Sequence, residues 1–374
     1  MKTPPLPRTS KHSPHNTPDA REVRVTMATV AEEAKVSQMT VSRSLRDDPM
    51  IPVATRQRIK RIAVQLGYRP DPAVSQLMAR LRRSRVSDSA SETVAWITTH
   101  ATATAWRDNP ASVAFHAGAT ARARELGYRI EEFWFTAPGM SGHRLSEILR
   151  ARGIRGVLVA PLAQTGVVVE LEWEHFACST CGAFSLHNVG LHRACAHYVN
   201  AVHLAWRELA RLGYRRIGLA LSSELNRRVA RLWLASALLE QNGLPQSRVV
   251  PPLVADDWRL ETVLSWMRQY RPDVVLSFRQ VCDWLQAGGV HVPEDCGFAL
   301  LHIEDPLFAG VDEQRPDIGA AALDLVVEQL NANQLGLPAK PKTVFIECSW
   351  VDGRTAPPPD RLKKNPSTTA NNHQ

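Results

Sequence analysis

Three short runs near the start of the chain carry apolar residues at helical spacing. One break in the rhythm separates the first two runs, and the third run ends at Gly67. The pattern predicts two helices joined by a tight turn and then a third helix, all between residues 25 and 67. The apolar positions are Val30, Ala31 and Ala34, then Val41 and Leu45, then Ile59, Ile62, Ala63 and Leu66.

Capping residues stand where these helices would begin. Thr26 precedes the first helix, Ser37 precedes the second, and Pro52 suits the first turn of the third. The hydroxyl of Ser37 is placed to accept a hydrogen bond from the amide of Met39 or Thr40. The local signals therefore agree with the apolar period.

The second predicted helix turns four side chains away from its apolar face. In a helix-turn-helix, the start of the second helix enters the major groove of DNA. There Gln can read an adenine edge, Arg a guanine edge, and Met can pack on a thymine methyl. The predicted base-reading residues are Gln38, Met39, Ser42 and Arg43, and the predicted contacts to the DNA backbone are Thr26, Ser37, Thr40, Thr55 and Arg56.

From residue 92 onward, strand-like and helix-like segments alternate. Such an alternation predicts parallel sheets that are covered on both faces by helices. Strands are predicted at residues 93–100, 128–135 and 156–161, with helices at 113–127 and 141–153. Further along, helix–strand pairs are predicted at 200–221 and 261–278, helices at 228–245 and 318–330, and strands at 292–303 and 343–353.

Length and charge support a division into parts with different roles. A chain of 374 residues is too long for one ordinary core and suits two or three domains. Residues 21–85 hold 14 of the 45 basic residues and 6 of the 37 acidic ones, which leaves 31 of each sign elsewhere. The whole positive excess thus falls on the predicted helices and their flanks, as expected for a surface that meets phosphate.

The two ends of the chain carry different signals. Residues 1–24 are rich in Pro, Ser, Thr and His and have no apolar core of a signal peptide, so a disordered tail is expected there and again at 354–374. No run approaches the length that a membrane span needs. A cytoplasmic protein without membrane contact is therefore expected.

The cysteines are considered as metal ligands first. Cys178 and Cys181 have the spacing of a zinc knuckle, and Cys195 with His197 could complete a set. However, the segment around the first pair reads as a strand of alternating apolar and small residues. Reduced thiols in the core, with no metal and no cofactor, are therefore expected.

The order of motifs in the first part resembles the lactose/galactose repressor family of bacterial transcription regulators. The matching pieces are Val25-Thr26-Met27, Val30-Ala31, Ala34, Val36-Ser37, Thr40-Val41-Ser42-Arg43, Thr55-Arg56, Leu66-Gly67-Tyr68-Arg69-Pro70 and Gln76-Leu77. The resemblance implies a helix-turn-helix DNA-binding domain at residues 25–70 and a hinge helix with a linker at 71–91. It also implies a homodimer that binds a double-stranded operator.

The resemblance assigns the hinge to the minor groove of DNA. A leucine from each subunit is wedged into the central base step, and this role falls on Leu77, with Val74 in the same short helix. The chain departs from the family at Arg46, where the family usually has Asn, and at Asp71-Pro72, where Asn usually follows the hinge proline.

For residues 92–353 the resemblance implies two parallel-sheet lobes similar to periplasmic binding proteins, at about 92–195 and 196–303, with the last elements shared between them. Ligands of such folds bind between the lobes at the carboxyl ends of strands. Trp106 and Phe115 are candidates for stacking on a flat ligand, and the family's ligand-holding arginine falls on Arg228 or Arg231.

One departure bears on the nature of the effector. The family commonly has Asn-Asp after the strand at 274–278, where the carboxylate accepts ligand hydroxyls, and this chain has Arg279 and Gln280. An arginine there puts a neutral sugar in doubt, and it leaves room for an anionic effector or for a site that has lost its ligand. Arg279 is thus the last candidate effector contact.

Three functions compete at this point. The first is a DNA-binding transcription regulator, typically a repressor, whose operator affinity depends on a small-molecule effector bound between the lobes. The second is an enzyme, but the chain has no GxGxxG after the first strand, no P-loop, no GxSxG and no HExxH. The third is a solute-binding transport protein, which would need a signal peptide and would have no use for the helix-turn-helix.

Overall fold

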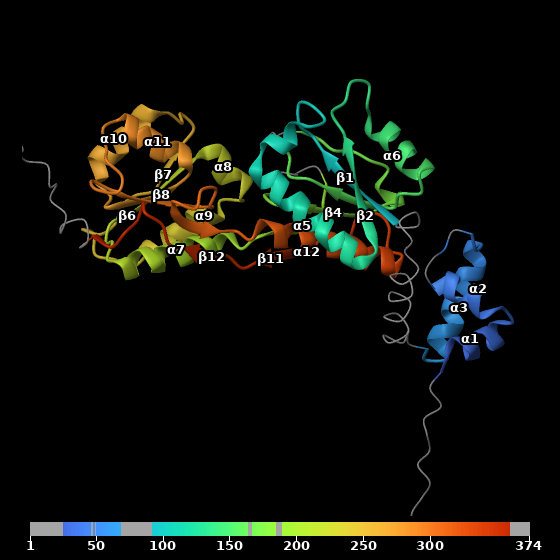
Figure 1. Cartoon of the computed structure of the whole chain (residues 1–374). Helices are drawn as coiled ribbons and strands as arrows, with labels where there is room; N and C mark the ends of the chain where they lie inside the picture. Colours follow the sequence, from blue (N-terminus) through green and yellow to red (C-terminus); the bar gives the residue numbers. More distant parts are fainter. Residues whose placement is uncertain are drawn as a thin grey trace, which may run out of the picture. The chain divides into compact units, whose positions relative to one another are not determined.

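The computed structural model describes residues 25–45, 48, 50–68, 92–163, 167–184 and 189–359. The chain divides into two compact units, Met1–Met78 and Ala79–Gln374. Figure 1 shows the helices α1, α2 and α3 of the first unit and the two α/β lobes of the second. Each unit is described by itself below.

The first unit contains the three expected helices, α1 (Met27–Ala34), α2 (Gln38–Leu45) and α3 (Val53–Gln65). Thr26 and Thr29 form a reciprocal capping box at the start of α1. Ser37 caps α2, because its hydroxyl accepts a hydrogen bond from the amide of Thr40 at 3.1 Å. Both predicted caps are confirmed.

A small apolar core holds the three helices together. Its fully buried members come from all three helices, so each helix depends on the other two. The turn between α1 and α2 runs through Lys35, which adopts a left-handed backbone with φ of 52°. The buried residues are Val30, Ala31, Ala34, Val41, Ile59 and Ala63.

Lobe 1 of the second unit is built on a parallel sheet of six strands in the order β11-β5-β4-β3-β1-β2. Helix α5 (Pro110–Leu126) and helix α12 (Arg315–Ala332) cover one face, and α6 (Gly142–Ala151) belongs to the core on the other. The strands are β1 (Glu92–Thr98), β2 (Tyr128–Trp134), β3 (Gly156–Val159), β4 (Ala177–Cys181), β5 (His192–Ala196) and β11 (Thr343–Ile346).

Lobe 2 repeats the plan with a sheet in the order β12-β10-β9-β8-β6-β7. All its pairings are parallel except that of β12 with β10. The strands are β6 (Ile217–Ser222), β7 (Leu253–Ala255), β8 (Val274–Ser277), β9 (Gly297–Leu300), β10 (Ala309–Asp312) and β12 (Ser349–Val351). The helices are α7 (Tyr198–Leu212), α8 (Ser223–Arg228), α9 (Leu232–Gln241), α10 (Leu260–Tyr270) and α11 (Arg279–Ala287).

The chain passes between the lobes three times. It leaves lobe 1 after β5, returns from β10 to α12, and leaves again between β11 and β12. One apolar cluster includes buried residues of both lobes, so the crossing segments pass through a continuous core. The predicted two lobes with shared last elements are therefore present.

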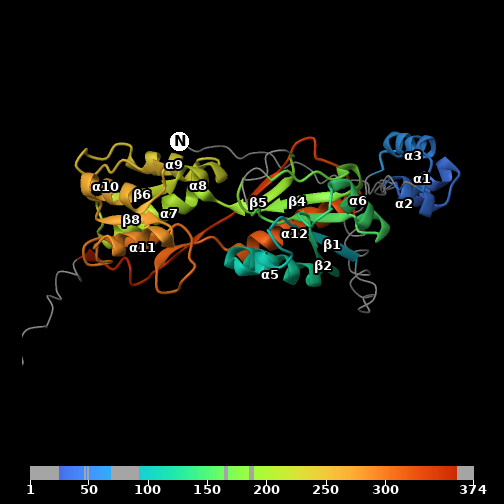
Figure 2. The ribbon, with the colours of Figure 1, turned by 90° about the horizontal axis from the view of Figure 1, so that it is seen from above.

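Close contact between α5 and α12 requires glycine. A Cβ on Gly118 would lie 1.8 Å from the carbonyl oxygen of Pro316, and one on Gly319 would lie 2.0 Å from the carbonyl oxygen of Phe115. The two helices lie side by side in both views of the ribbon (Figures 1 and 2). Their backbones approach so closely because neither glycine carries a side chain.

Several predicted elements differ from the structure. The helix expected at 228–245 begins only at Leu232, as α9, because Ala230 and Arg231 both adopt a left-handed backbone after the end of α8 at Arg228. The strand expected at 343–353 is two strands in two different sheets, β11 and β12. Strands β5, β7 and β10 are not among the predicted elements.

The C-terminal boundary predicted at 353 is wrong. Thr355 accepts hydrogen bonds from the amide of Phe298 through its carbonyl and from the amide of Ala309 through its hydroxyl. The hydroxyl of Tyr214 donates to the carbonyl of Pro357 at 2.7 Å, and Ala356 is 3% exposed. Residues 354–359 thus belong to lobe 2, although their composition is typical of a tail.

Candidate DNA-binding helix and the region between the lobes

The four predicted base-reading residues share one face of α2. At 3.6 residues per turn they cover roughly 140° of the helix circumference, and the opposite side carries Val41, which is fully buried. Gln38 and Met39 are exposed, with 71% of Met39 open to solvent, while Ser42 and Arg43 are half-buried. The helix therefore presents the predicted face outward.

Arg43 has an acidic partner that was not predicted. Its Nε donates to Oδ2 of Asp48 at 2.8 Å, and its Nη2 lies 3.4 Å from Oδ1 of the same carboxylate. The hydrogen bond to Asp48 raises the pKa of Arg43 above its usual value. Nothing in the sequence marked Asp48, because its carboxylate reaches Arg43 only after the chain has left α2.

The predicted backbone-contacting residues lie at the starts of helices. Thr26 and Ser37 cap α1 and α2, and the hydroxyl of Thr40 lies 2.9 Å from that of Ser37. Thr55 and Arg56 are half-buried in the first turn of α3. Amides at helix N-termini suit phosphate, so these positions fit the predicted role. Leu77 and Val74 lie outside the described residues.

In the second unit, Arg228 contacts both lobes. It ends α8 in lobe 2, and its Nη2 donates to the carbonyl of Leu162 beyond β3 of lobe 1, at 3.0 Å. Its own carbonyl accepts a hydrogen bond from the amide of Phe184 beyond β4, at 2.7 Å. The carboxyl ends of strands from both lobes therefore meet at Arg228.

A second arginine, Arg193, contacts the lobe 1 segment to which Arg228 is hydrogen-bonded. Arg193 on β5 is 7% exposed, donates to the carbonyl of Ala183 at 2.6 Å and lies 4.8 Å from the ring centre of Phe184. Burial lowers the pKa of Arg193. The contact with the ring and the carbonyl fixes the short segment that Arg228 touches.

Aromatic rings form a continuous row from lobe 1 into lobe 2. Phe184 lies 6.3 Å from Tyr198, and Trp233 lies 5.5 Å from both Tyr198 and Phe278. Phe278, directly after β8, lies 5.1 Å from His302. Sequence reasoning did not find this row, because its five members come from five separate segments and no spacing links them.

Two buried polar atoms near Arg228 lack a hydrogen-bond partner among the described residues. They are Oδ1 of Asn226 on α8 and Nε1 of Trp233 on α9, and each residue is 4% exposed. Buried polar groups without a partner are rare and are commonly satisfied by a ligand or an ordered water. Both atoms are thus open to a hydrogen bond with a ligand or an ordered water.

The predicted effector residues fall in different surroundings. Trp106 and Phe115 are 3% and 6% exposed, so both rings lie in the core, and Trp106 packs against His116 at 4.7 Å. A ligand could stack on either ring only if the protein first uncovered it. Arg231 is exposed at the start of α9.

Arg279 is neutralised by its own chain. Its guanidinium contacts Asp283 and Asp305, each at 3.0 Å, and stacks on Phe308 at 4.5 Å. The hydrogen bond to Asp283 is the main cause that raises the pKa of Arg279. An anionic ligand would therefore have to compete with two carboxylates.

The cysteine pair of the predicted strand cannot bind one metal. Cys178 belongs to the core on one face of the lobe 1 sheet and Cys181 to the core on the other, because neighbouring side chains of a strand alternate. Burial raises the pKa of Cys178 and of Cys195 to about 12. No group of three metal-ligating side chains occurs within the described part of the chain.

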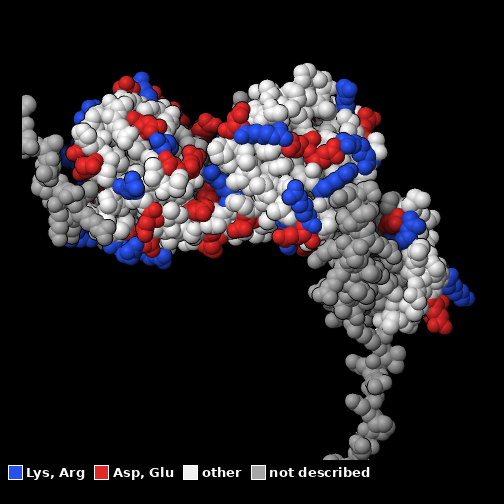
Figure 3. Space-filling model, in the orientation of Figure 1, with Lys and Arg blue, Asp and Glu red and all other residues white. Residues whose placement is uncertain are grey.

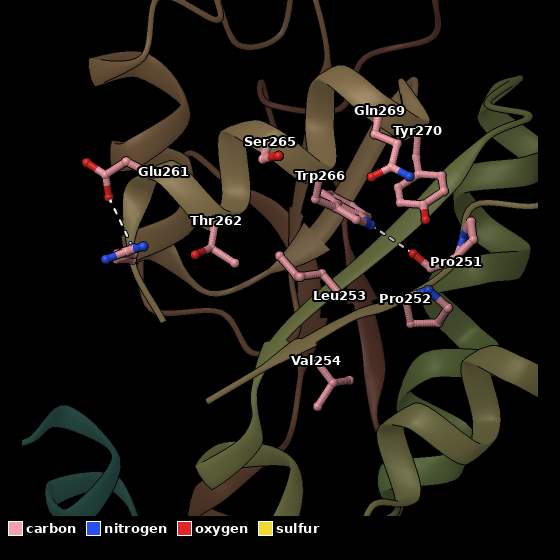
Figure 4. Close-up of a pocket in the computed structure, with 11 residues that line it drawn as sticks. Pro251, Pro252, Leu253, Val254, Glu261, Thr262, Ser265, Trp266, Gln269 and Tyr270 are labelled. Carbon is pink, nitrogen blue, oxygen red and sulfur yellow. Dashed lines mark hydrogen bonds and ion pairs between the residues drawn. The ribbon is translucent and has the colours of Figure 1, made fainter. Parts of the chain in front are cut away.

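A groove of about 500 Å³ lies beside β7, at the edge of the lobe 2 sheet (Figure 4). Leu253 and Val254 of β7 form one side, and Thr262, Ser265 and Trp266 of α10 form the other. The indole of Trp266 donates to the carbonyl of Pro251. None of the predicted effector residues lines this groove, and Arg259 at its rim is paired with Asp257 and Glu261.

Surface charge on the second unit is mixed. On the face shown in Figure 3, basic and acidic side chains are interspersed over both lobes, and neither sign dominates a broad area. This distribution agrees with the balance of charges outside residues 21–85. No helix among the described residues has the length and apolar character to cross a membrane.

Comparisons with known proteins agree with this geometry. Residues 23–71 match the family model "Bacterial regulatory proteins, lacI family". The HTH-type transcriptional repressor CytR of Escherichia coli strain K12 is 44% identical over 52 residues, which is 14% of this chain and 15% of that protein. The sequence match thus spans only a small part of the curated relative.

Solved structures extend the likeness to the lobes at the level of the fold. A complex of the transcriptional regulator CelR with cellobiose has a TM-score of 0.52 at 18% identity, covering 89% of this chain and all of that one. A transcription regulator-like protein from Staphylococcus haemolyticus has a TM-score of 0.52 at 14% identity, covering 72% of this chain and all of that one. Residues 23–71 of this chain are therefore similar to the lacI family of bacterial regulatory proteins, and the rest of the chain shares a two-lobed fold with these solved structures.

Proposed function

We propose that the protein is a sequence-specific transcription regulator, acting as a repressor in the cytoplasm, where it reaches chromosomal DNA. The observation that carries the proposal is the outward face of α2, which presents Gln38, Met39, Ser42 and Arg43 on a capped helix-turn-helix similar to the lacI family. A helix with such a face can enter the major groove and contact base edges.

We infer that the protein binds a pseudo-palindromic operator as a homodimer. One helix-turn-helix places only three or four side chains against bases, which is too few for useful specificity. Two copies double these contacts and match the symmetry of the site. Leu77 and Val74 are proposed to reach the minor groove between the two half-sites.

We infer further that a small-molecule effector controls operator affinity from the region between the lobes. Three crossing segments allow the lobes to close on each other, and Asn226 and Trp233 offer buried polar atoms to a ligand. A ligand that favours one lobe arrangement would change operator binding by about 1–3 kcal/mol. A sugar or another small metabolite fits the proposal, since the CelR complex with a similar fold contains cellobiose.

The pairing of Arg228 and Arg279 with the chain itself favours a second candidate. A regulator that has lost its effector would bind its operator constitutively, with the region between the lobes occupied by its own contacts. A solute-binding role for the lobes alone has no such support, because it leaves the helix-turn-helix without a use.

The experiment is a selection of duplexes from a random pool by the full chain, followed by affinity measurements on the selected sequence. We expect a two-fold related site, and we expect the variant lacking residues 25–84 to lose all DNA binding. Thermal shifts of that variant with cellobiose, gluconate and glucose 6-phosphate test for an effector. A full chain that enriches no sequence over random competitor would refute the regulator.

A further inference from the structure

Asp48 holds the guanidinium of Arg43 by one particular edge. The contacts at 2.8 Å and 3.4 Å involve Nε and Nη2, which form the side edge of the guanidinium plane. The two nitrogens of its end edge, Nη1 and Nη2, each keep a hydrogen that points away from Nε. A guanine offers O6 and N7 as a pair of acceptors that fits such an edge.

Asp48 is itself fixed in place. Its amide donates to the carbonyl of Arg43 at 3.0 Å, and its carbonyl accepts from the amide of Ile51 at 3.0 Å. Oδ1 of the carboxylate also accepts from the amide of Met50 at 2.9 Å. The carboxylate is therefore attached to the end of α2 before any DNA is bound.

We propose that Asp48 is a positioning residue that makes Arg43 selective for guanine; this rests on the proposed DNA-binding function. An arginine on an exposed helix samples many rotamers and can also bind phosphate, which carries no sequence information. The carboxylate of Asp48 removes that freedom and turns the end edge of Arg43 outward. It also opposes binding to phosphate in general, so its benefit lies in discrimination and not in affinity.

A simpler role for Asp48 is to cap the loop that follows α2. Asn can accept the same hydrogen bond from the amide of Met50 through its Oδ1, but it has no charge to hold Arg43. The substitution Asp48→Asn therefore keeps the cap and removes the pairing. Glu33→Gln on the exposed side of α1 changes the net charge equally and serves as the matched control.

The test uses the duplex selected by the full chain, with each guanine replaced in turn by 7-deazaguanine, which lacks the N7 acceptor. The guanine that Arg43 reads is the one whose replacement no longer matters in Arg43→Ala. At that position we expect the replacement to weaken binding of the wild-type protein about tenfold. In Asp48→Asn we expect less than about threefold, with tighter binding to unrelated duplexes.

Glu33→Gln should also bind unrelated duplexes more tightly while it keeps the full discrimination. In the Arg43→Ala background, Asp48→Asn should leave discrimination unchanged, because the two residues act as one unit. Asp48→Glu, which restores the carboxylate, should recover part of the preference. If Asp48→Asn does not fold, Asp48→Glu supplies the readout, because its longer side chain displaces the carboxylate and should lower the discrimination in part.

The outcomes distinguish a failure of the proposed DNA-binding function from a failure of the positioning role of Asp48. A wild-type chain that selects no duplex would refute the proposed function. A wild-type chain that selects a duplex, but whose discrimination against 7-deazaguanine is unchanged by Asp48→Asn, would overturn the positioning role and leave the function standing. Arg43→Ala without effect at any guanine would also overturn it.

Discussion

His116 shows how burial sets the behaviour of a single residue. Its ring lies 5.1 Å from Trp96 and 4.7 Å from Trp106, beside the ion pair of Arg107 with Glu132. Burial is the main cause that lowers the pKa of His116, and the charges of Glu132 and Arg107 act in opposite directions. The folded protein therefore holds the proton of this imidazole less readily than the unfolded chain does.

The lowered pKa of His116 makes the free energy of unfolding of the second unit depend on pH. Because the pKa of His116 is lower in the folded state than its unfolded value of about 6.5, the unfolded chain binds more protons as the pH falls through that region. We expect the free energy of unfolding to decrease below about pH 6.5, as seen in thermal unfolding between about pH 7.5 and 5. His116→Gln should reduce this dependence, whereas His175→Gln, at a half-buried position, should keep it. Equal slopes in all three proteins would contradict the prediction.

At the residue scale, sequence reasoning found the outward residues of α2 and failed on their partners. Helical spacing was enough to place Gln38 and Met39 on the exposed face. The Arg43–Asp48 pair and the row from Phe184 to His302 depend on tertiary contacts, which no local period encodes. Trp106 and Phe115 were candidates by type and position, but burial removed both from the surface.

At the scale of elements, α5 and α12 depend on two glycines for their contact. Helix propensity alone would favour alanine at both positions. The carbonyl oxygens of Pro316 and Phe115 leave no room for a Cβ, so tertiary contact overrides propensity here. Helix α12 covers the lobe 1 sheet and starts at a crossing segment. The packing of α12 against α5 therefore affects the stability of the whole lobe.

Gly319→Ala should therefore destabilise the second unit. A Cβ placed 2.0 Å from the carbonyl oxygen of Phe115 must push the two helices apart, at a cost of about 1–3 kcal/mol. Chemical denaturation followed by circular dichroism measures the change. Glu328→Ala, on the exposed side of the same helix, should change stability by less than about 0.5 kcal/mol. A stabilised Gly319→Ala protein would show that the contact is looser than described.

Element prediction succeeded where the signal was long. The helices of the first unit and β1 to β3 follow their apolar periods closely. Strand β7 has only three residues, and β5 buries His192 and Arg193, so neither shows a strand period. The separation of β11 from β12 falls inside one extended run, and only the sheet order reveals it.

At the scale of the second unit, Arg228 is a direct link between the lobes. Its side chain contacts the carbonyl of Leu162, and its carbonyl contacts the amide of Phe184. The first of these bonds depends on the side chain and the second does not. The lobe arrangement described is therefore held partly by a removable charged hydrogen bond.

Arg228→Ala should let the lobes move apart more readily. Loss of one charge-assisted hydrogen bond at a half-buried site is expected to shift the equilibrium between closer and more separated lobes by about 1 kcal/mol. Small-angle X-ray scattering of the variant lacking residues 25–84 should show a larger radius of gyration. Arg231→Ala, an exposed arginine three positions away, is the matched control and should scatter as the parent does. Identical curves for all three proteins would mean that Arg228 does not hold the lobes.

The order of strands also affects how the second unit can fold during synthesis and whether its lobes can be separated. Lobe 1 takes α12 and β11 from the far end of the chain, after nearly all of lobe 2 has been made. A ribosome that has released only the early strands of this unit has therefore produced a sheet with one face covered only in part, by α5, and with an unpaired edge. Neither lobe is one continuous stretch of the sequence. We therefore expect that the lobes can be expressed or exchanged between proteins only together, as the whole second unit.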